Sequence, residues 1–450
     1  MSEDSKLSHI KGFFVLHHYW LIRYINILFI SIILGAVCGF SMVLFNYMLI
    51  YFKSKMSSYL PYFISPLIAG LLTSLLVKYG HANRVMGTGA DAYVKDINNA
   101  DEEYLEQSKM GFSRKQNLLS KTLATGWTYG SGMVCGLEGP GLLIGGNLGC
   151  IFFRSDKFHI DRLDAFFIGA SACTGAILRA PISGALFCAE LPYFNHIRYK
   201  SLIPSIIASA VAYFIFCSFF EFTPLIKIDT LSIRPDQVNY LYLLPLLVVF
   251  GIVSGILVLL LMSLLRAFTN KLTELFENKP GLWILPFVGA AGYSLFLLIV
   301  IPFLPENYRN LLIGPDASFL NYLISVFNAS TISWEFLLIL AILFTIAIFL
   351  SIGTMNSAGI IMPLIIIGAI IGGLFGVLFY PQNPQLFVLL GISAFLGAAL
   401  NSPIAAIFII IELTWIPFLL IPASITTLIA YIFSGPSSII PGQKTVLENK

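Results

Sequence analysis

The sequence predicts an all-α polytopic membrane protein, built as a duplicated helical bundle with broken, re-entrant helices. The 450-residue chain is 57% hydrophobic and only 11% charged, whereas a soluble domain carries about 25% charged residues. Two matched pairs of motifs also occur in the same order in the two halves, which indicates an internal duplication. Several apolar stretches near these motifs are short and interrupted by Gly or Pro. Such backbone is tolerated at membrane depth only where it is buried in protein or lines a cavity.

The expected membrane spans are predominantly apolar stretches, of which about 20 residues suffice to cross a bilayer. They are Ile22–Phe52, Ile64–Val77, Leu202–Phe220, Tyr240–Leu265, Ile284–Phe303, Phe336–Leu350, Leu386–Leu400 and Phe418–Phe433. Lys6, Lys11 and Arg23 precede or begin the first span, which favours a cytoplasmic N-terminus. The expected organisation is a cytoplasmic segment at 1–21, a first transmembrane half at 22–220, a second half at 221–438 and a short tail at 439–450, with no soluble regulatory domain.

The duplicated motifs are a Gly-x-x-x-Pro and a longer glycine-containing block. In the first half Gly136-Leu-Glu-Gly-Pro140 precedes the block 169–182, and in the second Gly359-Ile-Ile-Met-Pro363 precedes the block 391–404. A proline just inside a helix start predicts that a helix begins at each motif, within apolar sequence. Paired broken segments of this kind indicate a transport site near the bilayer midplane.

Glu138 is the strongest candidate for a functional residue, because an ionisable group inside apolar sequence is costly and usually functional. Its carboxylate is expected near the free N–H groups of a helix start, where negative charge is favoured. An inorganic anion would be attracted to the same place and would compete with it. The alternative is an acid that only caps the helix. The neighbouring Gly136 and Gly139 favour the functional interpretation, because glycines allow close approach of the backbone.

Two further sets of polar groups belong to the repeated pattern. Glu190 and Glu412 end the long blocks at equivalent positions, so we expect a shared structural role, such as holding helix ends or loop amides. The alternative is the functional role that is usual for membrane carboxylates. Gly87-Thr-Gly89 is most often a plain turn, although the Thr88 hydroxyl could face an ion.

Composition argues against several other classes of protein. The net charge is +3, and no basic tract or phosphate-binding loop indicates nucleic acid or a nucleotide. The six cysteines lie in or beside apolar segments without a Cys-x-x-Cys pair, so they are expected to be buried and reduced. The histidines are dispersed, and we expect no metal and no cofactor. No nucleophile–base pair or ligand cluster is apparent, so we expect no enzyme.

Together these motifs resemble those of the CLC family of chloride channels and chloride/proton antiporters. Gly136-Leu-Glu-Gly-Pro140 is similar to the family's Gly-Lys/Arg-Glu-Gly-Pro, Gly359-Ile-Ile-Met-Pro363 to its Gly-x-Phe-x-Pro, and Gly87-Thr-Gly89 to its Gly-Ser-Gly-x-Pro. Lys121 also stands at the family's position upstream of the gate motif. The resemblance extends from about Ile22 to Ser438. It implies an inverted-repeat CLC-type helical bundle and a homodimer with one anion pathway per subunit.

The resemblance also implies roles for individual residues. Glu138 would be the gating glutamate, within a motif whose backbone is set by Gly136, Gly139 and Pro140. The anion site would be lined by the Thr88 hydroxyl, by the amides of Ile360 and Ile361, and by Ser438 in place of the usual pore tyrosine.

The chain departs from the family pattern at several of these positions. Leu137 replaces the usual basic residue, which weakens an outer electrostatic funnel, and Ile361 replaces the usual Phe. Asp91 stands where a proline would end the first signature. Leu191 falls where antiporters usually carry an inner proton-accepting glutamate, and the pore tyrosine is missing.

The interpretation that follows from these departures is a passive chloride channel gated by protonation of Glu138, because Leu191 cannot relay a proton. The alternative is a chloride/proton antiporter of the same family, with a fluoride/proton exchanger as a minor third possibility. The expected partners are chloride ions, protons under the antiporter alternative, and the lipid bilayer. The expected location is the prokaryotic inner membrane.

Overall fold

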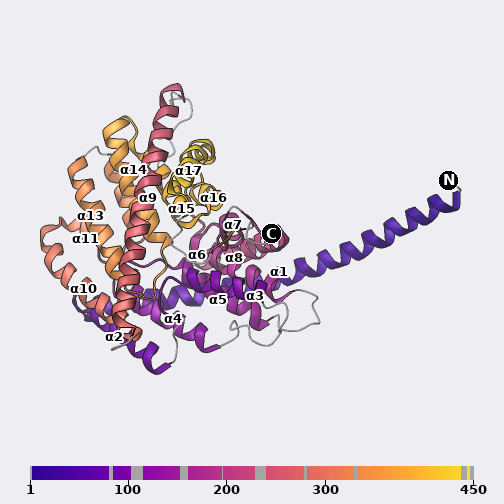
Figure 1. Ribbon diagram of the computed structural model, residues 1–450, viewed down its shortest axis with the longest axis horizontal. Coiled ribbons are helices and arrows are strands. Elements are labelled where there is room, and N and C mark those ends of the chain that lie inside the picture. Colours follow the sequence, from indigo (N-terminus) through magenta and orange to yellow (C-terminus); the bar gives the residue numbers. More distant parts are fainter. Residues whose placement is uncertain are drawn as a thin grey trace.

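The computed structural model describes residues 3–80, 85–102, 115–152, 161–194, 196–228, 240–277, 281–328, 332–436 and 443–445. These residues form a bundle of α-helices from which the first part of helix α1 projects (Figure 1). One small parallel sheet pairs β1 (Tyr193–Phe194) with β2 (Lys444–Thr445). The prediction of an all-α polytopic bundle is therefore confirmed.

The helices of the two halves follow one another in a matching order. In the first half they are α1 (Glu3–Tyr59), α2 (Ser65–Gly80), α3 (Ala90–Glu102), α4 (Lys115–Gly130), α5 (Glu138–Phe152), α6 (Arg162–Leu178), α7 (Pro181–Glu190) and α8 (Tyr199–Phe219). In the second half they are α9 (Tyr240–Phe276), α10 (Leu285–Val300), α11 (Glu306–Arg309), α12 (Ala317–Asn328), α13 (Trp334–Ser351), α14 (Ile361–Phe379), α15 (Pro384–Leu400), α16 (Pro403–Thr414) and α17 (Leu420–Ser434).

Seven helices among the described residues are long and apolar enough to cross a membrane. They are α1 from Ile25, α8, α9 from Leu241, α10 with its flanking turns, α13, α14, and α17 with the turn before it. Helix α15 is shorter, and it is buried along almost its whole length. The expected span Leu386–Leu400 is therefore an interior helix, whereas α14, which was not expected to span, is long enough to do so.

Helix α1 is continuous from Glu3 to Tyr59, so it begins within the expected N-terminal segment 1–21 and continues through the first expected span. The projecting part of α1 is visible in Figure 1.

Equivalent helices of the two halves pack in equivalent ways. Helix α1 packs on α8 as α9 packs on α17, and α5 packs on α6 as α14 packs on α15. The halves meet where α2 packs on α10 and where α7 packs on α16. The duplication in the sequence is therefore a duplication in space, and the two halves contact each other through equivalent helices.

Glycines allow the central helices to approach very closely. A Cβ atom at Gly145 of α5 would overlap the carbonyl of Gly169 in α6, and the reverse is also true. Gly368 of α14 and Gly391 of α15 stand in the same reciprocal relation. Small residues at helix crossings permit this close backbone contact inside membranes. The repeated glycine spacing thus sets the distance between the helices that carry the duplicated motifs.

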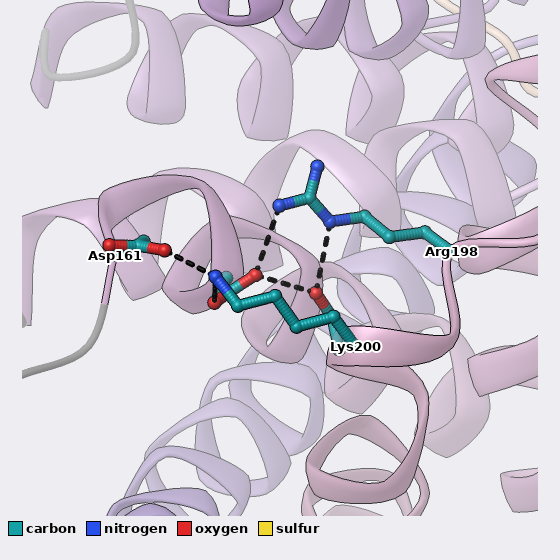
Figure 2. Close-up of polar contacts among 5 residues, drawn as sticks. Asp161, Arg198 and Lys200 are labelled. Atoms are coloured by element: carbon teal, nitrogen blue, oxygen red, sulfur yellow. Dashed lines mark hydrogen bonds and ion pairs between the residues drawn. The ribbon is translucent and has the colours of Figure 1, made fainter.

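An ion-pair cluster joins the starts of α6 and α8 (Figure 2). Arg198 Nη2 lies 3.2 Å from Asp164 Oδ1, Lys200 Nζ lies 2.9 Å from Asp164 Oδ2, and Ser201 Oγ donates to Asp164 Oδ1 at 2.7 Å. Lys200 also pairs with Asp161. Helix α7 lies between these two helix starts in the chain. The cluster therefore ties together the start of α6, before α7, and the start of α8, after it.

Candidate functional site

The starts of α5 and α14 meet at one point inside the bundle. Gly136, just before α5, and Gly359, just before α14, form an isolated antiparallel bridge. The amide of each donates to the carbonyl of the other, and both N···O distances are 2.8 Å. The two Gly-x-x-x-Pro motifs singled out in the sequence are therefore in direct contact.

Glu138 is the first residue of α5, and its side chain lies over this bridge. The residue is 2% exposed. A Cβ atom at Gly136 would overlap Glu138 Oε2, and one at Gly359 would lie 3.1 Å from the same oxygen. A Cβ atom at Gly136 would also lie 2.9 Å from the Gly359 carbonyl, and one at Gly359 would lie 2.8 Å from the Gly136 carbonyl oxygen, so glycine is required at both positions to bring the two backbones together.

The Glu138 carboxyl group lies near the backbone amides of Leu137, Glu138 itself and Met362. Within the described part of the chain, however, Oε2 is buried and has no hydrogen-bond partner. Leaving a buried charged oxygen unpaired is costly. The site therefore favours either a proton on this oxygen or replacement of the side chain by a free anion.

The helix starts supply the positive potential of the site. The first N–H groups of an α-helix have no intrahelical acceptor, and the helix dipole adds partial positive charge at the same end. Ile360 immediately precedes α14 and Ile361 begins it, and both residues are buried. Their amides therefore belong to a helix start that lies beside Glu138, as the sequence predicts.

The Gly-Thr-Gly turn is the third segment that reaches this point. A Cβ atom at Gly139 would overlap the carbonyl oxygen of Thr88, which therefore lies directly against the Gly139 backbone. The amide of Gly87 donates to the carbonyl of Met355, in the loop before α14, at 3.1 Å. The structure thus brings Thr88 to the start of α5 and holds the turn against the loop that precedes α14.

The Thr88 hydroxyl group is hydrogen-bonded within its own turn. Its hydrogen is donated to Asp91 Oδ1 at 2.9 Å, and the amide of Gly89 donates to the same oxygen at 3.0 Å. From the sequence, Asp91 was considered only as the residue that stands in place of the family's proline. The spacing Thr88-x-x-Asp91 at the start of α3 is typical of a capping box and was the signal that could have predicted this contact.

Lys121 fixes the turn from the side of α4. Its side chain is buried, and Nζ donates to the carbonyls of Val85 at 2.9 Å and Gly87 at 2.8 Å. This basic residue therefore orients the backbone that precedes Thr88. It also places a positive charge that interacts with Asp91.

Glu190 and Glu412 hold helix starts, as the sequence predicts. Glu190 accepts hydrogen bonds from the amides of Ile404 at 3.3 Å and Ala405 at 2.9 Å, at the start of α16. Glu412 accepts from the amides of Ile182 at 3.0 Å and Ser183 at 2.8 Å, at the start of α7. The Ser183 hydroxyl group also donates to Glu412.

The position of Leu191 contains no ionisable side chain. Leu191 is fully buried, and its carbonyl accepts from Gln443 Nε2 at 2.7 Å. The same nitrogen donates to the Leu400 carbonyl at 3.0 Å, and Asn401 Nδ2 donates to Gln443 Oε1 at 2.9 Å. Gln443 was not identified from the sequence, because it lies in a short polar tail. Ser438 lies outside the described residues.

Comparison with known proteins agrees with this geometry. The family model described as "Voltage gated chloride channel" matches residues 95–435. A relative named "H(+)/Cl(-) exchange transporter ClcA" from Salmonella paratyphi A is 28% identical over 326 residues, and its namesake from Salmonella newport (strain SL254) is 28% identical over 327 residues. Each match covers 68% of this chain and 64% of the relative, which is less than two thirds of the relative's length.

Solved structures show the same fold. A slow cyanobacterial Cl⁻/H⁺ antiporter is 19% identical, with a TM-score of 0.73 over 92% of this chain and 96% of that chain. A CLC-type fluoride/proton antiporter is 21% identical, with a TM-score of 0.74 over 93% of this chain and 98% of that chain. Because the family model covers most of the sequence and these structures share the whole architecture, the chain belongs to the voltage-gated chloride channel family, the CLC family.

Proposed function

We propose that the protein is a chloride/proton antiporter of the CLC type in which Glu138 is both the gate and a proton carrier. The observation that carries the proposal is the buried Glu138 carboxyl group at two meeting helix starts, with Oε2 unpaired within the described chain. The proposal is supported by the names of the relatives, which are proton/chloride exchange transporters. It replaces the passive channel as the preferred interpretation, because the relatives and solved structures described above are named exchange transporters and antiporters.

The proposed gate works by exchange of negative charge. When Glu138 is ionised, its carboxylate occupies the positive potential of the two helix starts. When Oε2 takes up a proton, the side chain loses its charge and with it the attraction that holds it there. A chloride ion then takes its place. The proton and the anion are thus bound alternately at one position, which is the requirement for coupled exchange.

The anion pathway next to this gate is proposed to consist of weak hydrogen-bond donors. The amides of Ile360 and Ile361 lie at the start of α14, and Thr88 lies against Gly139 of α5. Weak donors without a full positive charge suit a partly dehydrated halide that must also leave. Choice among chloride, bromide, nitrate and fluoride would be made by these groups.

A passive chloride channel remains the second candidate, and Leu191 is the observation that favours it. Leucine cannot accept a proton, and the residue is fully buried. Moving protons through an apolar interior without an ionisable group is costly. Antiport therefore needs another group to complete the proton route on this side.

The membrane context completes the proposal. Exposed apolar side chains along the seven candidate spans fit contact with lipid. We infer a homodimer in the prokaryotic inner membrane with a cytoplasmic N-terminus. The support is the family resemblance for the dimer and the basic residues Lys6, Lys11 and Arg23 for the orientation.

Proton movement driven by chloride in liposomes tests the proposal. The purified protein would be reconstituted under a chloride gradient with valinomycin and potassium to fix the voltage, while the external pH is recorded. Antiport predicts uphill proton movement that Glu138→Gln abolishes while chloride flux continues. The exposed-site variant Glu306→Gln is the matched control and should behave like the parent. A reversal potential at the chloride equilibrium value, insensitive to a pH gradient, would establish the channel instead.

A further inference from the structure

We propose that Asp91 makes chloride binding at Thr88 depend on a proton. The inference deepens the proposed function and rests on its assignment of Thr88 to the anion pathway. It concerns a residue that the gating scheme above does not use. Its basis is the hydrogen bond that takes the Thr88 hydroxyl hydrogen away from the pathway.

The Asp91 carboxyl group is built into the same turn as Thr88. Oδ1 accepts from the Thr88 hydroxyl group at 2.9 Å and from the Gly89 amide at 3.0 Å. A Cβ atom at Gly87 would lie 3.3 Å from Oδ2, so this second oxygen lies against the first glycine of the turn. The carboxyl group is half-buried rather than exposed to bulk solvent. Asp91 thus accepts hydrogen bonds from Thr88 and Gly89 and lies close to Gly87.

The Thr88 hydroxyl group has a single hydrogen to donate, and the partner that receives it decides whether Thr88 can bind an anion. A hydroxyl has one hydrogen to donate and two lone pairs to accept with, whereas an ionised carboxylate can only accept. While Asp91 is ionised, the single Thr88 hydrogen is held by Oδ1. Thr88 then presents only lone pairs to its other side, and these repel an anion.

Protonation of Asp91 reverses the hydrogen bond. A proton taken from water by the Asp91 carboxylate forms an O–H bond, and that O–H group can donate to Thr88 Oγ1. The Thr88 hydrogen is then free to donate to chloride. No other bond forms or breaks, and the proton returns to water when chloride leaves. One proton and one chloride ion therefore bind together at this turn.

Charged groups on neighbouring helices lie near Asp91. Lys121 on α4 carries a positive charge that interacts with Asp91. Lys121 also interacts with Cys135, which precedes α5, and Glu138 at the start of α5 lies beyond the contact of Gly139 with Thr88. On α3 itself, the Tyr93 hydroxyl group is directed to the Cys188 carbonyl at 2.9 Å. A chloride ion arriving beside Thr88 adds negative charge and favours the protonated form of Asp91.

The consequence is reciprocal coupling between the two ions. If protonation of Asp91 strengthens chloride binding, then bound chloride must strengthen proton binding to Asp91 by the same factor. Asp91 would thereby supply a proton-binding group within the pathway of a chain whose position 191 is leucine. The competing explanation is that Asp91 only closes the turn at the start of α3, and this would give no dependence of chloride affinity on pH.

Chloride binding to purified protein, measured by calorimetry at several pH values, separates these explanations. The parent for the experiment is Glu138→Gln, which removes competition from the gate. We expect chloride affinity to fall by about tenfold in total as the pH rises and Asp91 ionises, which is the effect of one hydrogen bond to a charged group. Asp91→Asn should bind chloride tightly at every pH, because its amide can donate to Thr88 Oγ1. Thr88→Val should bind weakly at every pH, and Thr88→Ser should behave like the parent.

The outcomes distinguish this inference from the proposed function. A parent without pH dependence would overturn the role of Asp91, as would a pH dependence that survives in Asp91→Asn or in Thr88→Val. Since Thr88→Val keeps the Asp91 contact to Gly89, it tests the inference even if Asp91→Asn fails to fold. Loss of antiport with pH-dependent binding intact would overturn only the antiporter. Absence of chloride binding in the parent at every pH would overturn both.

Discussion

Glu190 and Glu412 each accept hydrogen bonds from the start of a helix in the opposite half of the bundle. Each carboxylate lies near the end of a short helix of its own half and accepts the first amides of the equivalent helix in the other half. Ala405 N lies 2.9 Å from Glu190 Oε2, and Ser183 N lies 2.8 Å from Glu412 Oε2. Neither α7 nor α16 therefore has its N-terminal amides satisfied by its own half.

Replacement of Glu190 or Glu412 by Gln should destabilise the fold. Each substitution removes a charge-assisted acceptor from two amides at a helix start, at an expected cost of about 1–3 kcal/mol. The measurement is the midpoint of thermal unfolding in detergent together with the yield of folded protein. Glu306→Gln, whose side chain is 87% exposed, is the control and should leave the midpoint unchanged.

A different result at Glu190 would reassign it. If Glu190→Gln unfolds at the parent temperature and loses only proton movement in liposomes, Glu190 belongs to the proton route. A cavity of about 390 Å³ lined by Glu190, His196 and Tyr431 makes that outcome worth testing.

Chloride flux should rise as the pH falls, and Glu138→Gln should remove most of this dependence. The physical reason is that protonation removes the charge that holds Glu138 at the two helix starts, and Gln reproduces the uncharged form. Initial rates of chloride efflux from liposomes loaded with saturating chloride, across a pH series, measure the effect separately from chloride affinity. Equal pH profiles for Glu138→Gln and the unmodified protein would show that the gate lies elsewhere.

Gly139→Ala should be much more damaging than Gly141→Ala, although both lie in the first turn of α5. A Cβ atom at Gly139 would overlap the Thr88 carbonyl, whereas the nearest atom to a Cβ at Gly141 would be 3.6 Å away. Overpacking at Gly139 should cost about 1–3 kcal/mol. Gly141→Ala should be neutral or gain up to about 1 kcal/mol through reduced chain entropy. Thermal midpoints of the two variants test this pair directly, and similar losses in both would disprove the close approach at Gly139.

Lys121→Met should loosen the Gly-Thr-Gly turn. It leaves the carbonyls of Val85 and Gly87 without their buried donor, which should cost about 1–3 kcal/mol. Lys95→Met on α3 is a matched control, because Lys95 is exposed. The readout is the thermal midpoint, which we expect to fall only for Lys121→Met. Unchanged values would mean that the turn is held by its other contacts.

Much of this site can be predicted from the sequence, because the duplicated motifs contain residues whose physical roles few other residue types can fill. Gly136 and Gly359 must be glycines to bring two backbones together, and Glu138 stands out as a carboxylate in apolar sequence. The equivalence of Glu190 and Glu412 likewise predicted their shared contacts with helix starts. In each case one local pattern was sufficient to state the chemistry.

The contacts that sequence reasoning missed join segments with weaker patterns. Asp91 was considered only as a departure from the family's proline. Its hydrogen bond to Thr88 depends on where α3 begins, and α3 was not among the expected spans. Gln443 reaches Leu191 across 252 positions of chain, and no local periodicity encodes such a contact. The interior position of α15 is set by packing against its neighbours. Its apolar composition is like that of a membrane span, so the sequence did not reveal that position.

The bridge between Gly136 and Gly359 limits how the pathway can open. Two reciprocal hydrogen bonds of 2.8 Å join the backbones directly beneath the Glu138 carboxyl group. Parting the two helix starts would break both bonds in a setting without water to replace them, which is costly. Rotation of the Glu138 side chain breaks neither. Under the proposed function, access to the site would therefore change through the swing of a single side chain on a fixed frame, without a rocking motion of one half against the other.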